Sequence, residues 1–238
     1  SILKQSNMFK ANLENANLAR ADLRHTNLKV VTAFNANFDG INGWALFGQG
    51  SKFDGATFHG SDLNFARMSG SSMKNCDFQA ANFEAAWMAN VNFEGSNFTN
   101  ANLQEVKLSN YSLSKANFNN CIIHTSSNFG IILEKTNQNF NYKFDHSLIK
   151  FADFSNQFIN NELYDFSNIN LFDTCLIARS STNNNPDFKD ARNNKLIIGE
   201  NSAAKGTADN TYYTFNDILN NQRNGATDMG AYNWTTFD

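Results

Sequence analysis

The side chains that could do chemistry are few and are scattered along the chain. We expect the four histidines, none of which repeats at a metal-ligand spacing, to face solvent: His25, His59, His124 and His146. The three cysteines, Cys76, Cys121 and Cys175, are too sparse for a disulfide framework in a chain of this length. We interpret them as small apolar core residues.

The elements that must position these side chains show a period of five residues. Large apolar residues occupy every fifth position from Leu3 to Ile123, and the exceptions are Ala33, Gly43 and Gly48. A helix repeats at about 3.6 residues and a strand at 2, so neither explains this pattern. Each five-residue unit is therefore predicted to turn one corner of a coil.

Two further positions of the unit are also restricted. The residue two places before each large one is usually Ala, Ser or Cys, and Asn or Asp stands between them, as in Ala16-Asn17-Leu18. In this the chain resembles the pentapeptide-repeat family over residues 1–125, and more loosely to about residue 178. The resemblance implies an all-β fold, a right-handed quadrilateral parallel β-helix in which twenty residues make one coil.

Residues twenty apart are then predicted to stack. One inward column is a ladder of phenylalanines: Leu18, Phe38, Phe58, Phe78, Phe98 and Phe118. The Asn and Asp residues are predicted to bond to the local backbone at the corners. Asp62 and Glu84 fall on neighbouring coils, but many pairs on a charged ladder do so. We predict no catalytic, cofactor-binding or metal-binding residues, and hence no enzyme.

The period divides the chain into three parts. Residues 1–125 form the regular β-helix, and residues 126–178 form an inserted loop followed by looser coils. In the looser coils the five-residue period resumes, shifted by one residue: Phe144, Ile149, Phe154, Ile159, Tyr164 and Ile169. Residues 179–238 are predicted to be an irregular C-terminal capping tail that covers the last coil.

The tail resembles a terminal segment of secreted or surface parallel β-helix proteins. The matching pieces are Pro186-Asp187-Phe188 and the closing stretch from Gly225 to Asn233, although the proline of a central turn and a closing Glu are missing. The resemblance implies a location outside a cell or in a virus particle. No apolar run approaches the roughly 20 residues that cross a bilayer, so we expect no membrane span.

Four aromatic residues fall on or beside one corner of the third to fifth coils. They are Trp44, Phe47, Phe65 and Trp87, next to the glycines that break the inward phase. One interpretation is an exposed patch that binds a sugar ring or a protein partner. The other is that the glycines leave a dent and the rings fold over it to fill it.

Charge argues against nucleic acid as a partner. The net charge is −3, and residues 1–125 carry ten basic and nine acidic side chains. Some members of the family that the chain resembles are thought to mimic DNA and bind type II topoisomerases, which requires a markedly acidic rod. A basic groove for nucleic acid is equally lacking.

Three functions remain open. The first is a non-catalytic structural or adhesive module that binds a glycan or protein partner as part of a secreted, surface or virion protein. The alternatives are a carbohydrate-active enzyme on a β-helix scaffold and a DNA-mimic protein that binds topoisomerase. No cofactor is expected. The exposed edge of the first coil, at residues 1–5, is expected to stack on further sequence or on a partner subunit.

Overall fold

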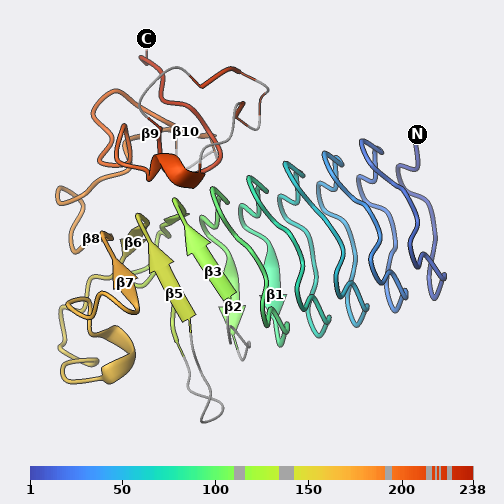
Figure 1. Cartoon of the computed structure of the whole chain (residues 1–238), viewed down its shortest axis with the longest axis horizontal. Helices are drawn as coiled ribbons and strands as arrows, with labels where there is room; N and C mark the ends of the chain where they lie inside the picture. The colour runs from blue at the N-terminus through green and yellow to red at the C-terminus, as the bar shows by residue number, and fades with distance from the viewer. Residues whose placement is uncertain are drawn as a thin grey trace.

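The protein is a rod of stacked coils with a C-terminal tail lying along one flank (Figure 1). The computed structural model describes residues 1–109, 116–133, 142–190, 195–212, 216–217, 219, 221–223 and 227–237. Gly225 and Ala226 of the predicted closing motif, and Leu113 of the predicted inward phase, lie outside these residues.

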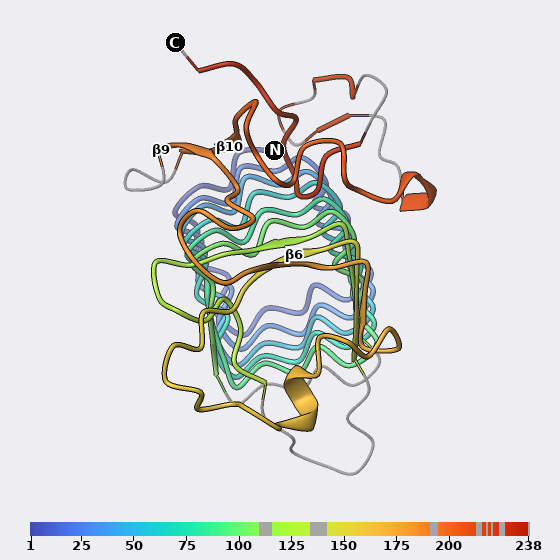
Figure 2. The same ribbon diagram turned by 90° about the vertical axis from the view of Figure 1, so that its left-hand side faces the viewer.

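Each coil of the regular rod contains twenty residues. Parallel bridges join residues one coil apart at four positions per coil, beginning with Ile2 to Asp22 and Asn7 to Asn27. The view along the rod shows successive coils stacked with the same outline (Figure 2). The predicted all-β repeat fold with parallel pairing is therefore confirmed, while its right-handed sense stays a prediction. On each side of the rod, backbone N–H and C=O groups form hydrogen bonds with the neighbouring coils. One example is Leu23 N, which donates to Asn42 O at 2.8 Å.

The corners need a left-handed backbone at every fifth residue. Asn15 and Arg20 have φ values of 56° and 58°, a conformation that costs a residue with a side chain roughly 1–2 kcal/mol. The Asn or Asp of the unit stabilises this turn: Asn17 Oδ1 accepts a hydrogen bond from Ala19 N at 3.1 Å. The predicted corner role of these polar residues is confirmed.

The core consists of inward columns of large side chains. Successive rings of the phenylalanine column are stacked at centroid distances between 4.7 and 5.6 Å: Phe38, Phe58, Phe78, Phe98, Phe118, Phe144 and Phe172. The small inward residues fill the remaining space. Cys76 and Cys121 are buried, and their Sγ atoms bond to Phe53 O and Phe98 O at 3.0 and 2.8 Å. Cys175 is only half-buried.

Short parallel strands mark the later coils. In chain order they are β1 (Trp87–Ala89), β2 (Lys107–Ser109), β3 (Ala116–Asn119), β4 (Ile122–Ile123), β5 (Tyr142–Asp145), β6 (Leu148–Lys150), β7 (Phe172–Asp173) and β8 (Leu176–Ala178). One sheet has the order β3-β5-β7 and another has the order β4-β6-β8. These sheets continue two sides of the regular rod.

The coils after Ile123 contain two insertions. Phe118 pairs with Phe144, so the predicted slip of one residue is confirmed, and Phe144 and Ile149 are buried. Phe144 then pairs with Phe172, which means that a second, unpredicted slip lies between them. Three inward positions predicted between these two strands are wrong. Their side chains are 73, 67 and 70% exposed: Phe154, Ile159 and Ile169.

The second insertion folds across the end of the core. It contains the 3₁₀ helix η1 (Glu162–Tyr164), and its rings pack on Phe151 of the last complete coil. Phe151 lies 4.6 Å from Tyr164 and 5.0 Å from Phe166, measured between ring centroids. The insertion therefore covers apolar side chains that would otherwise end the stack exposed.

The tail packs against the side of the rod. It contains the antiparallel pair β9 (Phe188–Asp190) and β10 (Lys195–Ile198) and the 3₁₀ helix η3 (Asn210–Tyr212). A separate apolar cluster joins the tail to the coils: Ile198, Ala204 and Met229 with Ile122, Leu148 and Ala178. The tail thus packs on one side of the later coils, while its predicted capping of the last coil stays a prediction. It also reaches back along the rod, where Asn82 Nδ2 donates to the Tyr232 hydroxyl at 3.1 Å.

One outward column explains where the tail docks. It is polar through the early coils and becomes apolar in the later ones: Asp22, Asn42, Asp62, Asn82, Asn102, then Ile122, Leu148 and Leu176. Ile122 and Leu148 are buried under the tail, with 4 and 0% of their surface exposed. The apolar end of this column therefore carries the apolar part of the docking site, and Tyr232 extends the contact to Asn82 on an earlier coil. Among the described residues, no helix has the length and hydrophobicity of a membrane-spanning segment.

The phenylalanine column gives a direct test of this fold. We expect Phe98→Ala to lower the free energy of unfolding by about 3–5 kcal/mol, because it leaves a cavity between two stacked rings. Phe154→Ala should change it by no more than about 0.5 kcal/mol, since that ring is exposed. Urea unfolding followed by circular dichroism measures both. Equal losses for the two variants would contradict the register of the coils.

Candidate functional site

Trp44 and Phe65 form an exposed aromatic pair at one corner of the rod. Each is 38% exposed, and their rings meet edge to face with centroids 5.8 Å apart. On the other side of Trp44 the imidazole of His25 lies 4.8 Å away, also edge to face. The three rings come from successive coils, because the corner residues repeat in register.

A second group occupies the adjoining side. Phe47, Arg67 and Trp87 take the same outward position on three successive coils, as the bridges from Phe47 to Arg67 and from Arg67 to Trp87 show. Arg67 Cζ lies 5.6 Å from the centroid of the Phe47 ring, and Lys29 Nζ lies 5.4 Å from it, so cations cover this ring. Trp87 is 51% exposed.

We call Trp44, Phe47, Phe65 and Trp87 the aromatic surface. The structure brings Trp44 into contact with Phe65, and it aligns Phe47 with Trp87 through Arg67. Arg67 was missed from the sequence, although the twenty-residue period places it between Phe47 and Trp87. The binding role of these residues stays a prediction.

The glycines beside the aromatic surface have a packing role. A Cβ atom on Gly43 would lie 3.0 Å from Leu63 Cδ2, and one on Gly48 would lie 2.4 Å from Met68 Sδ. Large inward side chains of the next coil therefore occupy the space that the glycines leave. The interpretation in which the aromatic rings fold over a dent is wrong, because the dent is already filled from inside and Trp44 stays outside.

Three polar side chains, half-buried Asn64 and buried Glu84 and Gln104, stack at the same corner, further along the rod. Asn64, Glu84 and Gln104 are in register, since Phe65 N donates to Glu84 O and Ala85 N donates to Gln104 O, both at 2.9 Å. We call these three residues the oxygen column. Within the part of the chain that the structure describes, each has one buried side-chain oxygen without a hydrogen-bond partner: Asn64 Oδ1, Glu84 Oε1 and Gln104 Oε1.

Charge around the oxygen column is negative. Glu84 is 1% exposed, and burial together with the carboxylates of Asp62 and Glu105 raises its pKa to about 7. Burial also raises the pKa of Asp62. Tyr232 of the tail lies close enough for Glu84 and Asp62 to add to the burial that raises the pKa of its hydroxyl. The pair Asp62 and Glu84, which the sequence placed on neighbouring coils, is therefore electrostatically coupled.

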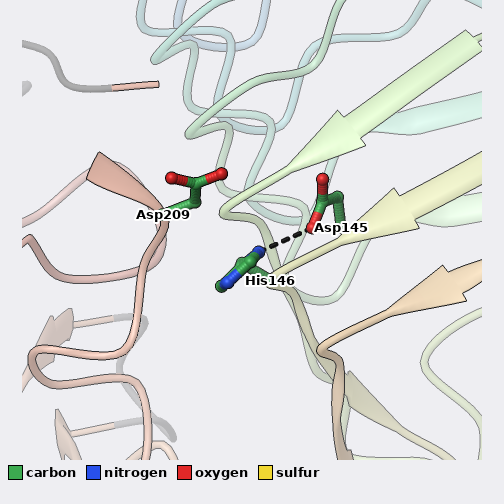
Figure 3. Close-up of side chains that lie close together, drawn as sticks. All are labelled: Asp145, His146 and Asp209. Atoms are coloured by element: carbon green, nitrogen blue, oxygen red, sulfur yellow. Dashed lines mark hydrogen bonds and ion pairs between the residues drawn. The ribbon is translucent and has the colours of Figure 1, made fainter. Parts of the chain in front are cut away.

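A second polar cluster joins the tail to the later coils (Figure 3). Asp145, His146 and Asp209 have ligand atoms within 4.8 Å of one another, and His146 Nδ1 lies 2.6 Å from Asp145 Oδ1. Lys143 Nζ lies 3.6 Å from Asp145 Oδ2 and already brings a positive charge to this carboxylate. The side-chain amide of Asn120 binds the backbone of Asp209: Asp209 N donates to Asn120 Oδ1 at 2.7 Å, and Asn120 Nδ2 donates to Asp209 O at 2.9 Å. The ion pairs of Asp145 lie within the coils, and the hydrogen bonds of Asn120 hold Asp209 of the tail beside them.

The histidines do not all face solvent, as the sequence had suggested. His59 is exposed, whereas the other three are partly buried: His25, His124 and His146. His124 packs edge to face against Phe188 of the tail, with centroids 5.9 Å apart. Burial, and then the positive charge of Lys150, lower the pKa of His124 to about 4.

The repeat itself identifies the family. The sequence profile for pentapeptide repeats matches eight copies, over residues 6–42, 49–79 and 76–110. The regular rod is a pentapeptide-repeat domain. No curated protein has a sequence significantly similar to that of the chain.

Solved structures of pentapeptide-repeat proteins are distantly similar. HetL, involved in heterocyst differentiation regulation in the cyanobacterium Nostoc sp. strain PCC 7120, is 17% identical over 60% of this chain and 71% of its own, with a TM-score of 0.33. Full-length QnrB1, a plasmid-mediated fluoroquinolone resistance protein, is 13% identical over 73% of this chain and 85% of its own, with a TM-score of 0.25. A protein from the Arabidopsis thaliana thylakoid lumen is 20% identical over 49% and 67%, with a TM-score of 0.21.

His124 should make stability depend on pH. Its folded pKa of about 4 lies below the unfolded value of about 6.5, so the fold favours the neutral ring. The stabilisation is complete above about pH 6.5 and is lost as the pH falls toward 4. When the pH is lowered from about 7 to about 5, the free energy of unfolding should fall in both proteins. The fall should be about 1–2 kcal/mol smaller in His124→Gln than in the unmodified protein.

Urea unfolding at each pH measures this difference. The control is His59→Gln, which changes an exposed ring and should keep the pH dependence of the unmodified protein. An unchanged pH dependence in His124→Gln would show that this ring is protonated equally in the folded and unfolded states.

Proposed function

We propose that the pentapeptide-repeat domain is a non-catalytic binding module that holds a protein partner on the aromatic surface. The observation that carries this proposal is the exposure of three of its four rings on a backbone fixed by hydrogen bonds between coils. Rings held on such a rigid backbone lose little conformational freedom when a partner binds.

The chemistry of the surface favours a protein partner. Trp and Arg are enriched among the residues that carry most of the binding energy in protein interfaces. Arg67 and Trp87 are paired on neighbouring coils here, and Trp44 lies at the adjoining corner. Lys29 and Arg67 flank Phe47, so a partner with acidic residues around an apolar centre would complement this face. The proposal includes a secreted, surface or virion location. This part is supported only by the resemblance of the tail to a terminal segment of secreted or surface β-helix proteins.

The other functions have less support. Asp62 and Glu84 are the carboxylates considered for a carbohydrate-active enzyme, but Glu84 is 1% exposed and cannot reach a polysaccharide. A DNA mimic needs a strongly acidic rod, and the ten basic and nine acidic residues of the first 125 do not make one. A glycan is the remaining alternative ligand for the rings.

A selection from a random peptide library displayed on phage tests the proposal. We expect peptides that bind the full chain to be rich in acidic and apolar residues. Their affinity should fall at least tenfold with the double variant Trp44→Ala, Trp87→Ala, because truncating a central aromatic residue costs about 2 kcal/mol. Phe9→Ala is the matched control, since Phe9 is 50% exposed on the first coil, away from this surface.

The outcomes separate the alternatives. Peptides that bind the double variant and the unmodified chain equally would overturn the role of the aromatic surface. A glycan array probed with the same proteins would favour the sugar-binding alternative if it gave a signal that only the double variant loses.

A further inference from the structure

The oxygen column presents buried acceptors that lack donors. Glu84 and Gln104 are each 1% exposed, and each has a side-chain oxygen without a hydrogen-bond partner. Asn64 adds a third buried oxygen of the same kind. A buried acceptor without a partner costs roughly 1–3 kcal/mol, and a cation between two neighbouring acceptors of the column would remove that cost.

The register of the coils places Glu84 between Asn64, one coil before it, and Gln104, one coil after it. Asn64, Glu84 and Gln104 lie directly above one another, and adjacent parallel strands are about 4.8 Å apart. Calcium binds oxygen at about 2.3–2.6 Å, so two oxygens on opposite sides of one ion are separated by about the same distance. Side chains on adjacent coils can therefore hold a single ion between them.

The charge and donor types also suit a hard cation. Asp62 lies on the coil before Glu84, and Glu105 acts on Glu84 from the coil after it, so negative charges accumulate on both sides. The Tyr232 hydroxyl bonds to Asn82 and closes the face over this corner. Carboxylate and amide oxygens are the ligands that calcium prefers, with water completing the shell.

We propose that Glu84 and Gln104, on adjacent coils, bind a divalent cation of the calcium type between them, beneath the edge of the C-terminal tail, with Asp62 and Glu105 adding negative charge. The ion offsets the negative charge of Glu84, Asp62 and Glu105 and coordinates the unpartnered oxygens of Glu84 and Gln104. It also stabilises the docked tail, because Tyr232 packs over the coil that carries Glu84. This site is independent of the aromatic surface and of the partner proposed for it.

Calcium binding to the full chain tests this site. After treatment with EDTA and dialysis to about pH 7.5, we expect calcium chloride at about 1 mM to raise the melting temperature by several degrees and to give a saturable titration heat. Glu84→Gln, which keeps the shape but removes the charge, should bind calcium at least tenfold more weakly. Gln104→Met, which removes one oxygen at similar volume, should also weaken binding.

Two control variants locate the site. Glu94→Gln changes a carboxylate that pairs with Lys74 on the surface and should leave calcium binding unchanged. Asp145→Asn alters the other polar cluster and should also leave it unchanged. Circular dichroism of each variant before titration shows that it is folded.

Each result decides the question. A loss of binding in Glu84→Gln and Gln104→Met, with both controls unaffected, supports the site. No response of the unmodified chain to calcium overturns it, as does an equal response in Glu84→Gln. If Glu84→Gln is more stable than the unmodified chain and calcium affects neither, the oxygens need only a proton on Glu84, and the cation site is wrong.

Discussion

Parallel hydrogen bonds between coils fix the position of every side chain on this rod. Residue i and residue i+20 are held in register over the regular part of the chain, as the bridges from Asn42 to Asp62 and from Asp62 to Asn82 illustrate. The inward columns then stack like with like, and the phenylalanine rings pack at nearly constant spacing. The outward columns become surfaces whose chemistry is set one residue at a time.

Because the backbone is uniform, differences along an outward column decide what each stretch does. One column is polar at Asp22 and apolar at Leu148, and the apolar cluster that joins the tail to the rod lies at its apolar end. At the neighbouring corner, Trp44 is exposed on one coil while Glu84 is buried two coils later. The edge of the tail thus separates an accessible aromatic surface from a covered polar one.

Much of this arrangement could be predicted from the sequence. The period placed Phe98 and Phe118 in one column, assigned the corner Asn residues to the turns and put Trp44 near Phe65. The prediction failed at Phe154, because a second insertion reset the phase there and no local pattern marks its length. The pair Asp62 and Glu84 could not be singled out from the sequence, since a charged ladder brings many acidic pairs equally close.

The sequence by itself determined the coil, its twenty-residue register and the residues that face inward, because each unit repeats the same local constraint and stacking adds only contacts between equivalent residues. Only the tertiary structure decided which outward residues are covered. The burial of Glu84, His124 and Ile122 depends on a tail that has no period and docks from a distant part of the chain. The burial that raises the pKa of Glu84 is a property of that docked arrangement and not of the repeat.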